Sequence, residues 1–169
     1  MSKNKLSVII PVFNEKKTIN EIIRRVKAVK VQKEIIIVDD FSTDGTRELL
    51  KKIKDPHVKV VYHDKNYGKG HAIKTGLANA SGSIVLIQDA DLEYDPQDYP
   101  SLINPIIDGK SKVVYGTRFP KMKKRPSLLK NKFFLANRAL TIASNILYRA
   151  KITDEPTCYK VFDAEVLKK

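Results

Sequence analysis

The sequence predicts an α/β fold with a mainly parallel sheet and helices on both faces, in three layers. Two observations support this prediction. Short apolar runs of strand length alternate along the chain with longer amphipathic segments of helical period. Within the apolar runs, polar and apolar residues do not alternate, which is typical of strands buried on both faces of a parallel sheet. Repeated units of this kind connect by right-handed crossovers, so we expect a doubly wound sheet.

The first half of the chain is expected to form three strand and helix pairs. Thr18 and Glu21 have capping-box spacing at the start of the first predicted helix. Ser81 and Gly82 follow the third helix and end it. The predicted strands cover residues 6–10, 34–38 and 59–63, and the predicted helices cover residues 18–29, 46–53 and 72–79.

A fourth apolar run, residues 84–87, is predicted to be a buried strand that ends at Asp89. Asp95 and Pro96 then have the order of an N-cap and a first helical residue, so a helix is expected from there to residue 107. A further strand is predicted at residues 112–115.

A basic, proline-containing loop at residues 119–132 precedes one more predicted helix. We expect its apolar stripe to pack on the core. The alternative is an amphipathic helix at a membrane surface, which the basic loop and Phe133 and Phe134 favour. The stripe consists of Leu129, Phe133, Ala136, Leu140, Ala143 and Leu147, and the opposite face carries Lys130, Asn137, Arg138, Thr141 and Asn145.

Size and composition are those of one domain. A chain of 169 residues can bury about two-thirds of its unfolded surface. Cys158 is the single cysteine, so no internal disulfide forms and a reducing compartment is favoured. The chain contains neither an apolar run of membrane-spanning length nor the apolar core of a signal peptide. We therefore expect a soluble or peripheral protein.

The net charge of +13 is concentrated in one segment. Residues 109–153 contain twelve lysines and arginines and no acid. Such a segment suits nucleic acid, an anionic membrane surface or phosphorylated substrates, and a solvated basic loop is the plain alternative. Nucleic acid is not expected as a partner, because the chain has neither a recognisable reading motif nor interleaved stacking aromatics.

Acidic residues follow three of the predicted strands. Asp89 and Asp91 come after the fourth apolar run, Asp39 and Asp40 after the second, and Glu15 shortly after the first. Open α/β sheets bind ligands at the carboxyl ends of their strands, and paired carboxylates suit Mg²⁺ or Mn²⁺. The spacing of the Asp89 pair alone favours a solvated turn, but the acids after the other strands favour a metal site.

Five motifs together resemble, in order and spacing, those of the family 2 glycosyltransferases, whose catalytic domain has a GT-A fold. The resemblance is greatest to the polyprenyl-phosphate sugar transferases, the group that includes dolichyl-phosphate mannosyltransferases, and covers roughly residues 5–163. The motifs are Pro11 to Glu15, Asp39 to Thr46, Asn66 to Ala72, Asp89 to Asp91 and Gly116 to Arg118.

The resemblance implies an enzyme that moves a hexose, of the mannose or glucose type, from a GDP- or UDP-sugar to a polyprenyl phosphate with inversion. Asp89 and Asp91 would hold Mg²⁺ or Mn²⁺ against the diphosphate of the donor, with Glu93 as a third oxygen ligand. Arg118 would add a charge-assisted contact to a phosphate.

The nucleotide of the donor would lie against the first two motifs. The resemblance implies that Pro11, Phe13, Glu15 and Asp40 line the pocket for the base and ribose and that Lys69 faces the diphosphate. Two neighbouring acids, Asp39 and Asp44, either take part in this pocket or bond the backbone of their own turn.

The acceptor side of the family is matched by the segment from Thr153 to Lys160, in which Asp154 is the candidate base. A lipid monophosphate is mostly dianionic at neutral pH and needs no base, so Asp154 would then orient groups instead. A saccharide hydroxyl acceptor, which does need a base, is the alternative within the family. A relative that binds a nucleotide sugar without transferring it is another.

Other motifs are excluded or incomplete. Gly68, Gly70 and Asp89 imitate a dinucleotide fingerprint, but Ile73 stands where the third glycine should be. The three histidines lack metal-ligand spacing, and no phosphate loop or nucleophile elbow occurs. We expect one catalytic domain over residues 1–169, shortened at its carboxyl end relative to the family, located in the cytoplasm as a peripheral protein at the membrane face.

Overall fold

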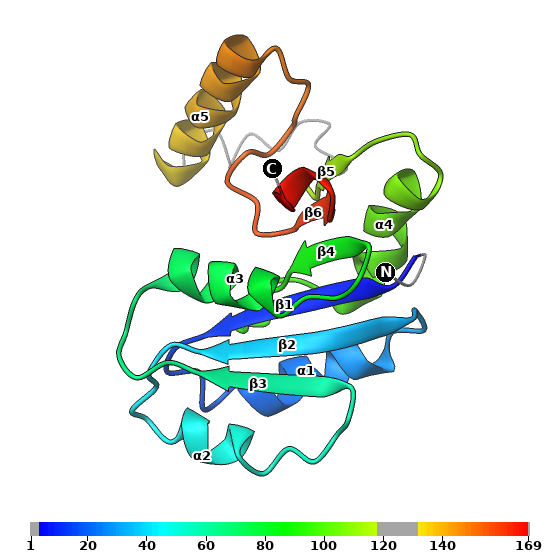
Figure 1. The fold of residues 1–169 in the computed structure, drawn as a ribbon. Helices are drawn as coiled ribbons and strands as arrows, with labels where there is room; N and C mark the ends of the chain where they lie inside the picture. Colours follow the sequence, from blue (N-terminus) through cyan, green and yellow to red (C-terminus); the bar gives the residue numbers. More distant parts are fainter. Residues whose placement is uncertain (1–3, 118–131, 169) are drawn as a thin grey trace. The chain divides into compact units, whose positions relative to one another are not determined.

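A computed structural model describes residues 4–117 and 132–168 of the chain (Figure 1). These residues form two compact units. The first contains the described residues of 1–114 and 161–169, and the second contains those of 115–160. The expectation of a single domain stays a prediction.

The sheet has six strands in the order β3-β2-β1-β4-β6-β5. Neighbouring strands are parallel for β1 with β2, β1 with β4, and β2 with β3, whereas β6 runs antiparallel to β4. The predicted mainly parallel α/β sheet is confirmed. The strands are β1 (Leu6–Val12), β2 (Lys33–Asp39), β3 (Val58–Tyr62), β4 (Ile84–Ile87), β5 (Val113–Tyr115) and β6 (Lys160–Asp163).

Helices flank the sheet of the first unit. Figure 1 shows α3 in front of the sheet and α1 behind it. On the front face, Ile73 and Leu77 pack against Ile9 and Val85, and a side chain at Gly76 would collide with Ile9. The helical elements are α1 (Ile19–Ala28), α2 (Thr46–Leu50), α3 (Lys69–Ala78), the short η1 (Pro96–Asp98), α4 (Tyr99–Ile107), α5 (Lys132–Tyr148) and η3 (Val166–Lys168).

Helix starts agree with the sequence in one case and differ in another. Asp95 accepts a hydrogen bond from the Gln97 backbone at 3.0 Å, as an N-cap should. The predicted capping box at Thr18 is wrong. The Thr18 hydroxyl bonds Glu15 instead, and Glu21 pairs with two arginines on its own helix. These alternative partners leave neither member of the predicted box available for capping.

Helix α5 turns the opposite face inward from the one expected. Within the second unit, Thr141 is 3% exposed, while Ile146 and Leu147 are 73% and 75% exposed. Polar partners explain this orientation. The Thr141 hydroxyl accepts from Glu155 N at 3.1 Å, and the Asn145 amide exchanges two hydrogen bonds with Ile152. The expectation that the apolar stripe packs on the core is therefore wrong for the described part of the helix. Residues 119–131 of the basic loop, which include Leu129 and Lys130 of the predicted helix, lie outside the described residues.

One carboxylate ties three strands together at the amino end of the sheet. Glu34 on β2 accepts from Lys5 at 2.7 Å, from the Ser7 hydroxyl on β1 at 2.5 Å, and from Ser81 and Gly82 just before β4. Burial alone would raise the pKa of Glu34, but the hydrogen bonds outweigh it and lower the pKa to about 2. This junction joins the start of β4 to the strands beside it.

We expect Glu34→Gln to lower the free energy of unfolding at pH 7 by about 1–3 kcal/mol, since charge-assisted hydrogen bonds are lost. The pKa of Glu34 is lower in the folded protein than its ordinary value of 4.5. The stability that the Glu34 carboxylate contributes is therefore complete above pH 4.5 and is lost as the pH falls toward about 2. Urea unfolding at several pH values should show the difference between wild type and variant shrinking below pH 4.5. The exposed Glu48 provides a control, Glu48→Gln, and an equal loss in both variants would contradict the assignment.

Candidate functional site

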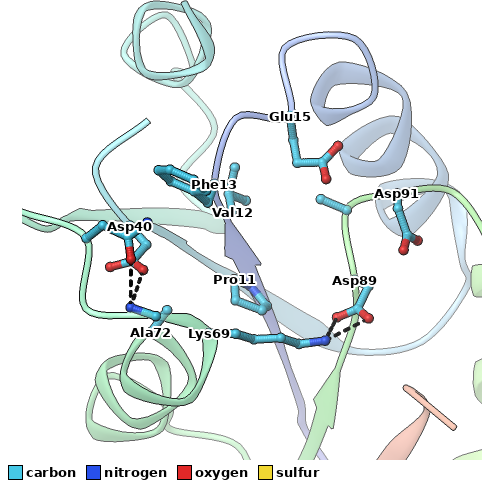
Figure 2. A pocket seen from close by; sticks show the side chains of 12 residues that line it. Pro11, Val12, Phe13, Glu15, Asp40, Lys69, Ala72, Asp89 and Asp91 are labelled. Carbon is cyan, nitrogen blue, oxygen red and sulfur yellow. Dashed lines mark hydrogen bonds and ion pairs between the residues drawn. The ribbon is translucent and has the colours of Figure 1, made fainter. Parts of the chain in front are cut away.

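A pocket of about 320 Å³ lies at the carboxyl ends of β1, β2 and β4. All its lining residues belong to the first unit. Figure 2 shows Phe13 and Asp40 toward one side of the pocket and Asp89 and Asp91 toward the other. The lining residues are Pro11, Val12, Phe13, Glu15, Asp40, Asn66, Gly68, Lys69, Ala72, Asp89, Ala90 and Asp91. The predicted donor-site residues of the first unit thus come together, with Glu93 as the exception.

A residue other than glycine with positive φ lies beyond each of these three strand ends. Asn14 after β1 has φ 57°, Phe41 after β2 has φ 68°, and Leu92 after β4 has φ 66°. Such conformations are unfavourable for residues other than glycine and persist where surrounding contacts enforce them. Asn14 shows such contacts, since its backbone N–H donates to Ser42 at 2.9 Å and its side chain accepts from Thr43 at 2.8 Å.

Asp40 is 2% exposed and is held by three donors. One oxygen, Oδ1, accepts from the His63 ring at 2.7 Å and from Tyr67 N at 2.9 Å, and Oδ2 accepts from Gly68 N at 2.7 Å. Burial would raise the pKa of Asp40, but these hydrogen bonds outweigh it and lower the pKa. The carboxylate is therefore ionised at neutral pH and fixed in orientation.

Asp89 and Asp91 differ in their surroundings. Lys69 at the start of α3 contacts both oxygens of Asp89, at 2.7 and 2.8 Å, and Figure 2 shows this contact. Asp91 is exposed, and its Oδ1 accepts from the Glu93 backbone at 3.1 Å. Asp89 is thus partly neutralised, while Asp91 projects an open carboxylate into the pocket.

These carboxylates fit a hard divalent cation. Two anionic oxygen donors at one edge leave room for water and phosphate oxygens, which is the donor set that Mg²⁺ and Mn²⁺ take. No group of three or more potential metal ligands occurs among residues 4–117 and 132–168. The Glu93 side chain is exposed and does not line the pocket, and its role as a ligand stays a prediction.

Two buried residues that the sequence did not single out support Asp89. Gln88 is fully buried, and its amide donates to the Asp89 carbonyl at 2.8 Å. The Tyr99 hydroxyl on α4 donates in turn to Gln88 at 2.7 Å. A polar glutamine directly after four apolar strand residues is unusual, and this signal in the sequence could have pointed to Gln88 as a residue that supports Asp89.

The structure resolves the two ambiguous acids in favour of local roles. Asp39 is fully buried and pairs with Arg47 at 2.6 Å. Asp44 accepts from Thr46 N at 3.0 Å and from Lys16 N at 3.1 Å, at the start of α2. Neither residue lines the pocket.

Two predicted site residues lie apart from this pocket. Asp154 belongs to the second unit, where it is 2% exposed. Arg118 lies outside the described residues. Their predicted roles toward acceptor and phosphate stay predictions.

His63 was excluded as a metal ligand from its spacing, and the structure shows a different use. Its ring is 8% exposed and lies between Asp40 and the Thr75 hydroxyl on α3. The sequence alone contained no sign of this role, because the two partners are 23 and 12 residues away along the chain.

The described helices include none with both the length and the hydropathy needed to cross a membrane.

Curated relatives match about two-thirds of this chain. An undecaprenyl-phosphate 4-deoxy-4-formamido-L-arabinose transferase of Proteus mirabilis is 36% identical over 122 residues, covering 68% of this chain and 37% of that protein. A protein of the same name from Salmonella choleraesuis is 35% identical over 112 residues, covering 62% of this chain and 34% of its own length. The chain thus spans little more than a third of these relatives.

Solved structures share the fold over nearly the whole chain. A mannosyltransferase from Pyrobaculum calidifontis, in complex with GDP-Man and Mn²⁺, has a TM-score of 0.68 at 26% identity, covering 96% of this chain and 45% of that one. Glucosyl-3-phosphoglycerate synthase from Mycobacterium tuberculosis, with Mn²⁺, UDP and phosphoglyceric acid, has a TM-score of 0.72 at 24% identity, covering 97% and 57%. The predicted GT-A fold is confirmed by this likeness. The sequence model of glycosyl transferase family 2 matches residues 7–169, and the chain belongs to that family.

Proposed function

We propose that this chain transfers a sugar from a nucleoside diphosphate to a polyprenyl phosphate, with a divalent metal and with inversion at the anomeric carbon. The observation that carries the proposal is the pocket itself, where carboxylates from three strand ends meet at one edge of the sheet. The Proteus and Salmonella relatives are named as undecaprenyl-phosphate sugar transferases, and the Pyrobaculum neighbour was solved with GDP-Man and Mn²⁺.

The two sides of the pocket suit the two parts of a nucleotide sugar. Phe13 is 46% exposed and offers a ring face to a base, beside a buried acceptor at Asp40. At the other side, Lys69 and the start of α3 lie beside Asp89 and Asp91, and together with a bound divalent cation they would favour a diphosphate. This arrangement would hold the donor with its base at Asp40 and its diphosphate at Asp89 and Asp91.

Departure of the nucleoside diphosphate is the demanding event, because negative charge develops on its oxygens. A bound Mg²⁺ or Mn²⁺, held by Asp91 and Asp89, would supply Lewis-acid stabilisation of that charge. Lys69 would contribute a further cation close by. Attack from the opposite face by an acceptor oxygen would invert the anomeric centre.

The acceptor segment is built against α5 in the second unit. The side chains of Thr141 and Asn145 form hydrogen bonds with backbone atoms at both ends of residues 152–155. Asp154 lies within this stretch. A phosphate acceptor is already ionised at neutral pH, so Asp154 would orient the acceptor rather than remove a proton.

The outer face of α5 suits a membrane surface. Because its polar residues bind segment 152–155, its apolar side is exposed, including Leu135, Leu140, Ile142, Ile146 and Leu147. The helix lies in the acid-free basic stretch of residues 109–153, whose charge complements an anionic cytoplasmic leaflet. A lipid-linked acceptor resides at such a surface.

The metal role predicts that Asp91→Asn loses the Mn²⁺-dependent part of nucleotide binding. With UDP or GDP and Mn²⁺ at about 100 times the dissociation constant, the wild type should gain about 2.7 kcal/mol of stability in thermal unfolding. Asp91→Asn should gain little beyond what nucleotide alone provides. Asp108→Asn, an exposed change of equal charge at the C-cap of α4, is the control. Absence of any metal-dependent shift in the wild type would refute the proposed function.

Replacement of Asp154 distinguishes the two acceptor classes. With a polyprenyl phosphate acceptor, Asp154→Asn should lower turnover by less than about tenfold, because no proton has to be removed. A loss of about 10² to 10⁴ in kcat would instead indicate a saccharide hydroxyl acceptor and a general base. Transfer of radiolabelled sugar to each acceptor, with folding checked by circular dichroism, measures the difference.

The membrane proposal predicts binding to vesicles that contain anionic lipid. The double change Ile146→Glu and Leu147→Glu should weaken partitioning at least about tenfold, since two large apolar side chains no longer enter the interface. Ile107→Glu together with Val113→Glu changes two exposed apolar residues outside α5 and serves as the matched control. Equal binding by both double variants in a sedimentation assay would count against α5 as the docking face.

A further inference from the structure

His63 does not line the pocket, but its ring contacts Asp40, which does. It follows β3 directly, and its Nδ1 lies 2.7 Å from Asp40 Oδ1 while its Nε2 lies 2.9 Å from the Thr75 hydroxyl. A carboxylate only accepts hydrogen bonds, so Nδ1 must carry a proton. This holds whether the ring is neutral or cationic, because only the bond between Nε2 and Thr75 changes direction.

The donors around Asp40 occupy most of its acceptor capacity. A carboxylate has about four lone-pair positions, two on each oxygen. His63 and Tyr67 N fill both positions of Oδ1, and Gly68 N fills one of Oδ2. Among the bonds of the described residues, one position on Oδ2 remains for a ligand.

Ring packing keeps the loop that supplies these donors in place. Tyr67 and His71 stack with centroids 4.6 Å apart, and His63 meets both rings edge-on at 5.3 and 5.4 Å. The loop between β3 and α3 is therefore fastened to Asp40 by its backbone and to His63 by its rings. Loss of the histidine would remove one donor to Asp40 together with these edge-on ring contacts.

A single remaining acceptor discriminates between nucleobases by their Watson–Crick edges. Guanine presents two adjacent donors, N1–H and the N2 amino group, which pair best with both oxygens of a carboxylate. Uracil presents one donor, N3–H, between two carbonyl oxygens. Cytosine has a lone pair at N3, which a carboxylate repels. A guanine at Asp40 would bury a donor without a partner, and such groups are costly.

We infer that the pocket selects uracil nucleotides, and that His63 is the positioning residue that sets this preference by occupying Oδ1 of Asp40. This inference rests on the proposed function, because it assumes that the donor's base lies at Asp40. It narrows the donor from a GDP- or UDP-sugar to a UDP-sugar.

Isothermal titration with UDP, GDP, CDP and pyrophosphate, each with saturating Mn²⁺, tests the inference. We expect wild type to bind UDP at least about tenfold more tightly than GDP, the penalty of one unpaired buried donor. It should also bind UDP more tightly than CDP, whose N3 lone pair would meet the carboxylate. His63→Leu should weaken UDP binding about tenfold and bring the UDP and GDP affinities closer together. His63→Asn retains an N–H donor near the position of Nδ1 and should restore both affinity and preference.

Pyrophosphate separates a base-specific effect from general damage, because it lacks a base. Its affinity should be the same in wild type and all variants, and the exposed His57→Leu should behave as wild type. Equal binding of UDP and GDP by wild type would overturn the inference without any variant. Parallel loss of pyrophosphate binding, or no rescue by asparagine, would also overturn it. Failure of every diphosphate to bind would instead refute the proposed function.

Discussion

The parallel register of β1 with β2 and β4 is the constraint on which the site depends. Backbone hydrogen bonds continue the ladder past the strand ends, from Asp40 N to Val12 O at 2.8 Å and from Gln88 N to Ile9 O at 2.9 Å. Asp40 and Asp89 thus leave the sheet at fixed points. Because side chains alternate between faces with period two, a slip of one residue would turn a carboxylate away from the pocket. The Glu34 junction at the opposite end of the strands opposes such a slip.

The strands and the acids that follow them could be predicted from the sequence for the same physical reason. A strand buried on both faces needs an uninterrupted apolar run, so an acid can follow it only where the chain leaves the core. The apolar run at residues 84–87 therefore predicted the end of a strand, and Asp89, which follows it, lines the pocket. The family resemblance also pointed to Lys69, which lines the pocket.

What sequence reasoning missed depends on partners distant in the chain. β6, at residues 160–163, pairs antiparallel with β4. No local sequence pattern predicts this pairing. The periodicity of α5 identified two faces but could not say which one had a partner, and Thr141 and Asn145 found theirs in segment 152–155. His63 was judged by ligand spacing, whereas its ring contacts the carboxylate of Asp40, directly after the neighbouring strand β2.

The two sides of the pocket hold their carboxylates by different means, and this difference suits different parts of a donor. Asp40 is held by N–H groups, which orient it without cancelling its charge. Asp89 is held by the Lys69 ammonium, so Asp89, Asp91 and Lys69 together have a formal charge of −1. That sign opposes a diphosphate, and a divalent cation would reverse it to +1. Metal and diphosphate should therefore bind far better together than either does alone, which makes the donor complex, rather than the free metal, the species this edge of the sheet is built to receive.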